Sequence, residues 1–112
     1  MRKYAALLIV LVAAGCAGSL QSTAVTPQQR LYAATGDYIV YGQIVLQTVS
    51  DPLTLPETKA TLKELDRRVY AALGIARAAY DRGELTEITV LVAETALREL
   101  RSRLVTEGKL TQ

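Results

Sequence analysis

The chain contains no histidine, no tryptophan and no phenylalanine, and its one cysteine is Cys16. Without histidine, and with a single cysteine, the commonest nucleophile and zinc-binding arrangements have no residues from which to form. An intramolecular disulfide is excluded because Cys16 has no partner. The sequence therefore predicts a non-enzymatic protein with no catalytic residue, no metal site and no cofactor site.

The chain also lacks a large net charge, because it has 13 Lys and Arg residues and 11 Asp and Glu residues. Proteins that hold nucleic acid or anionic lipid by charge present a surplus of basic side chains. We therefore expect no nucleic-acid partner and no electrostatic attraction to lipid headgroups.

The chain opens with Met1-Arg2-Lys3, and the apolar stretch that follows, 4–14, has only eleven residues. A membrane-spanning helix needs about 20 apolar residues, so this stretch is too short to span a bilayer comfortably. A charged start, a short apolar segment and small residues after it are typical of a secretory signal. We expect this segment to be removed from the mature protein.

The residues at the end of this stretch, Ala13-Ala14-Gly15-Cys16, resemble the lipobox of bacterial lipoproteins. The third residue before the cysteine is more often Leu in that motif, and here it is Ala13. The resemblance implies cleavage before Cys16 and attachment of diacylglycerol and fatty acids such as palmitate to it. Ala17 in the next position implies delivery to the outer membrane, facing the periplasm. In a source with a single membrane, the same signal implies that the protein is anchored on the outer face of that membrane.

The sequence thus divides into a signal peptide, 1–15, an acylated cysteine with a flexible tether, 16–26, and a folded domain, 27–112. Two of the 13 basic residues leave with the signal, so 11 remain against 11 acidic residues. The nine tether residues that follow the cysteine reach at most about 30 Å. We expect the domain to stay close to the membrane through acylated Cys16.

The first predicted helix spans about 27–49. Thr26 suits the N-cap, Pro27 the first helical position, and Gln29 the third position of a capping box. β-Branched and aromatic residues are frequent in 38–49, which leaves a strand open as an alternative there. The apolar stripe of the helix consists of Leu31, Ala34, Tyr38, Tyr41, Val45 and Thr48.

The second predicted helix spans about 55–82. Thr54 and Glu57 have the spacing of a capping box, and Gly83 is suited to end the helix. Its charged residues fall on the face opposite the apolar stripe. That stripe consists of Leu62, Leu65, Val69, Ala72, Leu73, Ala76 and Tyr80.

The third predicted helix spans about 87–107, with Thr86 as its N-cap and Gly108 after its end. Three helices with short links favour an all-α, up-down-up three-helix bundle. The apolar stripe of this helix consists of Val90, Ala93, Leu97, Leu100 and Leu104.

Two kinds of polar side chain are candidates for a binding or chemical role. Glu94 is the one charge in the apolar run 88–97, and a buried carboxylate can have a raised pKa suited to acid–base chemistry. The alternative is a surface pair with Arg98 at i+4. Tyrosines can bind glycans or peptides, but they can also pack in a core with the hydroxyl at its rim. The second interpretation applies to Tyr38, Tyr41, Tyr70 and Tyr80, which lie on or beside the predicted stripes.

The first helix is unusually poor in charge. Its stretch 31–49 contains one charged residue, Asp37, whereas the 26 residues 57–82 of the second helix include ten. Tyr32, Ile39 and Leu46 repeat every seven residues on a line rotated about 100° from the core stripe. Either the helix is wedged between the other two, or part of this line is exposed as a surface for self-association or for a partner.

The start of the domain, Thr26 to Arg30 followed by Leu31-Tyr32-Ala33, resembles small helical lipoproteins of phages, prophages and their hosts. We expect a membrane-anchored envelope lipoprotein that presents a helical bundle for protein-protein assembly. The alternative is a binding module for a small apolar or glycan ligand between the helices. A closed apolar cavity would favour the ligand, and an apolar strip on the outside would favour assembly.

Overall fold

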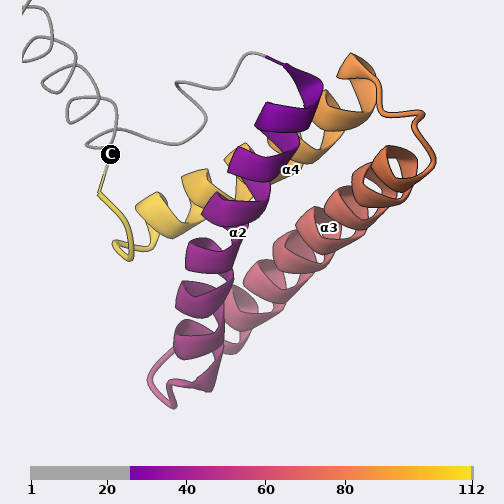
Figure 1. Cartoon of the computed structure of the whole chain (residues 1–112). Coiled ribbons are helices and arrows are strands. Elements are labelled where there is room, and N and C mark those ends of the chain that lie inside the picture. Colours follow the sequence, from indigo (N-terminus) through magenta and orange to yellow (C-terminus); the bar gives the residue numbers. More distant parts are fainter. Residues whose placement is uncertain (1–25, 112) are drawn as a thin grey trace, which may run out of the picture.

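The computed structural model describes residues 26–111, which form three helices (Figure 1). The helices are α2, Pro27–Ser50, α3, Pro56–Asp81, and α4, Glu87–Thr106. The described part contains no strand, so the strand alternative for 38–49 was wrong. The predicted signal peptide, Cys16 and nearly all of the tether lie outside the described residues. Between 26 and 111, no helix is long and apolar enough to cross a membrane.

Most helix ends follow the predicted capping residues. The Thr26 hydroxyl accepts a hydrogen bond from the backbone N–H of Gln29 at 3.1 Å, and the Gln29 side chain accepts one from the Thr26 N–H at 3.2 Å. At the start of α4, the Thr86 hydroxyl accepts a hydrogen bond from the backbone N–H of Thr89. Gly83 and Gly108, which follow α3 and α4, have φ angles of +72° and +73°. These left-handed angles favour glycine and end the helices where the sequence predicted.

The start of α3 differs from the prediction. Its N-cap is Leu55, which makes no side-chain capping bond, so the capping box expected from Thr54 and Glu57 is absent. Pro56 occupies the first helical turn, and its fixed φ suits that position. Proline therefore places the N-cap of the helix, Leu55, one residue after the expected cap, Thr54.

Successive helices run in opposite directions. The Gln28 amide near the start of α2 donates a hydrogen bond to the Tyr80 hydroxyl near the end of α3. Farther along α2, the Tyr38 hydroxyl bonds Asp66 in the middle of α3. The link 82–86 then turns the chain back, and α4 passes behind α2 in Figure 1. This antiparallel pairing of α2 with α3 is the one that an up-down-up order requires.

The core lies where the three apolar stripes meet. All five residues of the predicted α4 stripe are buried, and so are most of those on α2 and α3. Tyr80 is an exception, because it is 44% exposed and Ala79 is buried in its place. The central cluster consists of Leu31, Ala34, Val45, Leu62, Val69, Ala72, Leu73, Ala76, Val90, Ala93, Leu97, Leu100 and Leu104.

Candidate interaction surface

The line predicted on the first helix lies on the solvent side of α2. Tyr32 is 81% exposed, Ile39 is 59% exposed and Leu46 is 64% exposed. The neighbouring core stripe, which includes Leu31 and Val45, packs against α3 and α4. The helix therefore buries one side of its apolar arc and leaves the other in solvent.

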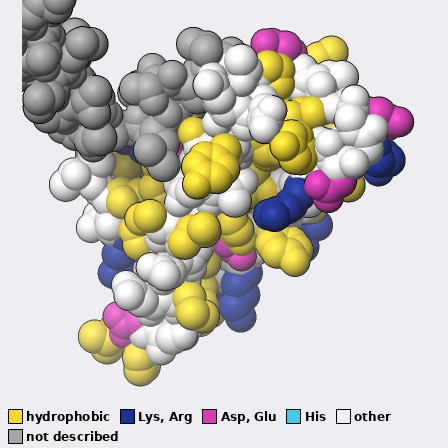
Figure 2. All heavy atoms as spheres, in the orientation of Figure 1, with side chains coloured by type: hydrophobic (Ala, Val, Ile, Leu, Met, Phe, Trp, Pro, Cys, Tyr) yellow, Lys and Arg dark blue, Asp and Glu magenta, His cyan; other side chains and the backbone are white. Residues whose placement is uncertain are grey.

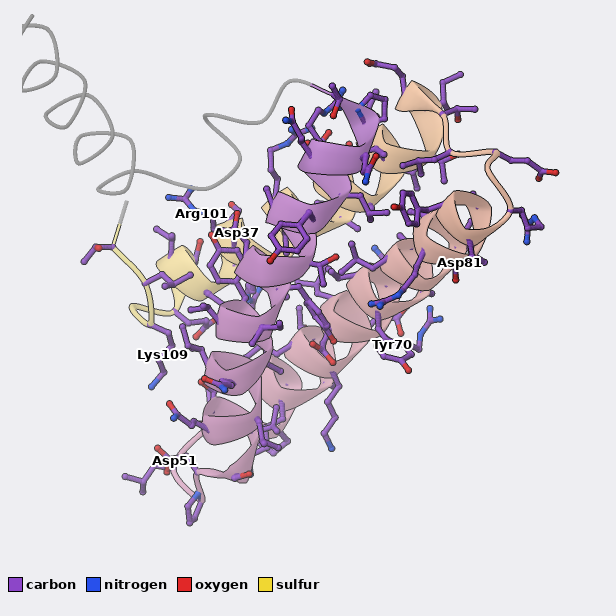
Figure 3. The ribbon with its side chains drawn as sticks, viewed as in Figure 1. Asp37, Asp51, Tyr70, Asp81, Arg101 and Lys109 are labelled. Atoms are coloured by element: carbon purple, nitrogen blue, oxygen red, sulfur yellow. The ribbon has the colours of Figure 1, made fainter. Side chains whose placement is uncertain are left out.

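The exposed side of α2 carries no charged residue from its first turn to its last. Apolar side chains are visible over this part of the molecule in Figure 2. Asp37 is half-buried and is not on this side; in Figure 3 it lies on the side of α2 where Arg101 is seen. We call this surface the outer face of α2; its exposed residues are Gln28, Gln29, Tyr32, Ile39, Val40, Gln43, Leu46, Gln47 and Ser50.

An ion-pair cluster holds the first turns of α2 against α4. The Arg30 Nε donates to Glu94 Oε2 at 3.2 Å, Arg30 Nη2 donates to Glu94 Oε1, and Arg30 Nη1 donates to Glu87 Oε2 at 3.0 Å. Glu94 is only 7% exposed, whereas the Glu87 side chain is in solvent. The hydrogen bonds from Glu94, and then those from Glu87, raise the pKa of Arg30 above its ordinary value. This cluster fixes which side of α2 faces outward.

The expected surface pair between Glu94 and Arg98 was wrong. Arg98 Nη2 instead donates to Thr95 Oγ1 at 3.2 Å. Glu94 lies one residue after Ala93 on the inner side of α4, which directs its carboxylate toward α2 rather than along its own helix. The sequence signal was incomplete: Arg30 precedes the core residue Ala34 by one helical turn, which places Arg30 near the core side of α2 but does not identify its partner.

A second polar contact joins the middles of α2 and α3. The Tyr38 hydroxyl donates to Asp66 Oδ1 at 2.9 Å. Burial, and then the hydrogen bond to Asp66, raises the pKa of Tyr38 to about 12. Tyr38 and Tyr41 pack against the core as predicted. Tyr70, drawn pointing away from α3 in Figure 3, is 71% exposed, so the core-packing interpretation was wrong for it.

A shallow hollow lies on another part of the surface, between α3 and α4. Leu91 and Val92 in its lining are about half exposed, so the hollow is open to solvent. At its rim the Arg68 guanidinium lies 3.8 Å from the Glu99 carboxylate. This geometry differs from the closed apolar cavity expected of a small-ligand module. The lining residues are Arg68, Ala72, Leu91, Val92, Thr95, Ala96 and Glu99.

The described residues also include no cluster of three or more acidic, cysteine or histidine side chains suited to a metal ion. Comparison of the chain with known protein families, with curated proteins and with solved structures found no match. The outer face of α2 is therefore the candidate functional site, on its geometry alone.

Proposed function

We propose that the protein is a non-catalytic envelope lipoprotein, anchored through acylated Cys16, whose three-helix bundle presents the outer face of α2 for protein-protein assembly. Its place is the outer membrane facing the periplasm, or the outer face of the plasma membrane in a source with one membrane. The lipobox-like sequence before Cys16 supports the anchor.

The observation that carries the assembly role is the exposure of Tyr32, Ile39 and Leu46 on a face without charge. Single exposed apolar residues are ordinary on a protein surface, but here four of them lie on one helix face among uncharged Gln and Ser side chains. They are Tyr32, Ile39, Val40 and Leu46. The exposed faces of α3 and α4 carry Arg and Glu side chains among their apolar residues. Among the exposed faces of the three described helices, the outer face of α2 is thus the one without a charged side chain.

Site-specific photo-crosslinking in intact cells tests this role. A photoreactive amino acid is placed at position 39, and adducts are identified by mass spectrometry. Position 75 is the matched control, because Ile75 of α3 is 65% exposed and therefore comparable to Ile39. We expect protein adducts from position 39 and few from position 75. Equal adducts from both positions, or none from position 39, would reject the assembly role.

The anchor is tested separately with Cys16→Ser. This substitution removes the acylated sulfur, and two acyl chains are what stable anchoring requires. We expect labelled palmitate to be incorporated into the parent chain and not into the variant, which should leave the membrane fraction. Retention of the variant on membranes, with no label in the parent chain, would reject the lipoprotein assignment.

The ligand-binding alternative has weaker support. Its expected site is a closed cavity between helices, and the hollow between α3 and α4 is open, with half-exposed Leu91 and Val92. Small-molecule sites usually enclose most of their ligand. The assembly proposal, unlike the ligand-binding alternative, explains why the outer face of α2 has exposed apolar residues and no charge.

A further inference from the structure

We infer that the occupant of the outer face of α2 is the same face of a second copy of this chain, packed antiparallel about a two-fold axis that passes beside Ile39. This inference rests on the proposed assembly role and names its partner. A two-fold contact requires a face that is complementary to itself. The outer face of α2 meets this requirement in its charge, its shape and its position relative to the tether.

The charge of the face favours a copy of itself. Bringing a face with a net charge onto its own copy places like charges together and opposes association. The outer face of α2 has no charged residue, so it can meet its own copy without this cost. A charged partner, in contrast, would lose hydration against this face and would gain no ion pair in return.

The spacing of the apolar residues favours an antiparallel arrangement. Tyr32 and Leu46 each lie seven residues from Ile39, on either side of it. A two-fold axis at Ile39 therefore places Ile39 against its copy and Tyr32 against the partner's Leu46. A parallel arrangement would instead pair two large Tyr32 rings at one end and two smaller Leu46 side chains at the other, and would splay the helices.

Backbone electrostatics and helix geometry support the same arrangement. Antiparallel neighbours place the partial positive end of one helix beside the partial negative end of the other. A seven-residue repeat keeps an apolar line facing its partner when two helices cross at about 20°. Ile39 lies near the middle of α2, so the contact extends equally toward both helix ends.

The proposed tether keeps the helical bundles of all copies close to the same membrane surface. The nine residues that separate Cys16 from Thr26 reach at most about 30 Å. An α2 of 24 residues is about 36 Å long, so two antiparallel copies lying along the membrane have starts about 36 Å apart. Both starts remain within reach of one bilayer. Confinement to this layer raises the effective concentration of one copy for another.

Cysteine crosslinking of the full-length chain in native membranes tests the arrangement. The parent chain, whose one cysteine is Cys16, is the control for any disulfide formed by Cys16 itself. The single variants are Tyr32→Cys, Ile39→Cys and Leu46→Cys. In the antiparallel dimer only position 39 faces its own copy, because two copies of position 32 lie about 21 Å apart at 1.5 Å per residue. A disulfide needs Cα atoms within about 7 Å. Ile75→Cys is the matched control.

We expect Ile39→Cys to form a band of twice the monomer mass after mild oxidation. Tyr32→Cys and Leu46→Cys should each remain monomeric alone, and differently tagged copies of the two should form a mixed dimer when expressed together. Self-linking at all three positions would show a parallel arrangement and overturn the inference. So would the absence of any linked dimer, or equal linking by Ile75→Cys.

The photo-crosslinking experiment separates this inference from the assembly role. Adducts of position 39 with another envelope protein, without any cysteine-linked dimer, would overturn self-association and leave assembly standing. Adducts with lipid alone would overturn both, because they would show that the face lies on the bilayer. Adducts between two copies of the chain, together with the expected cysteine pattern, support the inference.

Discussion

At the residue scale, the contact between Arg30 and Glu94 determines how α2 sits on the bundle. Glu94 is buried, and Arg30 supplies two of its hydrogen bonds. Removing one partner of a buried ion pair leaves the other charge uncompensated, which costs more than the pair contributes by itself. The orientation of the outer face therefore depends on this pair.

We expect Arg30→Met to lower the free energy of unfolding by about 3 kcal/mol, because it leaves the Glu94 carboxylate buried without its cation. Combining it with Glu94→Leu should recover most of this loss, since apolar residues often replace a buried ion pair without cost. Glu87→Gln is the control, and because Glu87 is exposed it should cost less than about 1 kcal/mol. Urea unfolding of the four chains measures this. Equal losses from Arg30→Met and Glu87→Gln would contradict the account.

Tyr38 makes the bundle less stable at high pH. Its pKa is raised to about 12, mainly by burial, so the folded state favours the neutral hydroxyl. The corresponding stability is fully present below the ordinary tyrosine pKa of about 10 and is lost as pH rises toward 12. The ultraviolet absorbance of tyrosinate should show one late titration that Tyr38→Phe removes. Asp66→Asn should lower the pKa of Tyr38 only partly, because burial remains. Titration of Tyr38 at the ordinary tyrosine pKa of about 10 would contradict this.

At the scale of the helices, capping separates two threonines that look alike in the sequence. Thr26 completes a capping box with Gln29, whereas Thr54 lies one residue before the N-cap Leu55. We expect Thr26→Ala to reduce the free energy of unfolding by about 1 kcal/mol, a typical value for loss of a cap. Thr54→Ala is the matched control and should have little effect. Chemical denaturation measures both, and a larger effect at Thr54 would count against the observed start of α3.

Helix boundaries and core stripes were predictable because their causes are local. Thr26, Gly83 and Gly108 act on their own turn of backbone, and the α4 stripe needs only helical periodicity. The partner of Glu94 was not predictable in this way. It depends on the rotation of α2 against α4, and in a single sequence Arg98 on the same helix is an equally good cation for it.

At the scale of the whole molecule, three helices form the core and leave part of the apolar arc of α2 uncovered. The sequence predicted the line through Tyr32, Ile39 and Leu46 but left open whether it was buried. Only the packing of the bundle decides this, because a helix wedged between two others would have buried it. The structure places all three residues in solvent. The proposed anchor at Cys16 would favour the proposed self-association, because copies held on one membrane meet at high local concentration.

The most direct test of the central claim is the molecular mass and melting temperature of the chain from Ala17 onward, with and without Ile39→Asp. We expect the unmodified chain to dimerise as its concentration rises toward about 1 mM, the range that tethering supplies. Ile39→Asp should be monomeric throughout and should melt at the temperature of the diluted unmodified chain, because exposed substitutions change stability little. Ile75→Asp should still dimerise. An unmodified chain that stays monomeric, together with a large loss of melting temperature in Ile39→Asp, would contradict the account and assign Ile39 to the core.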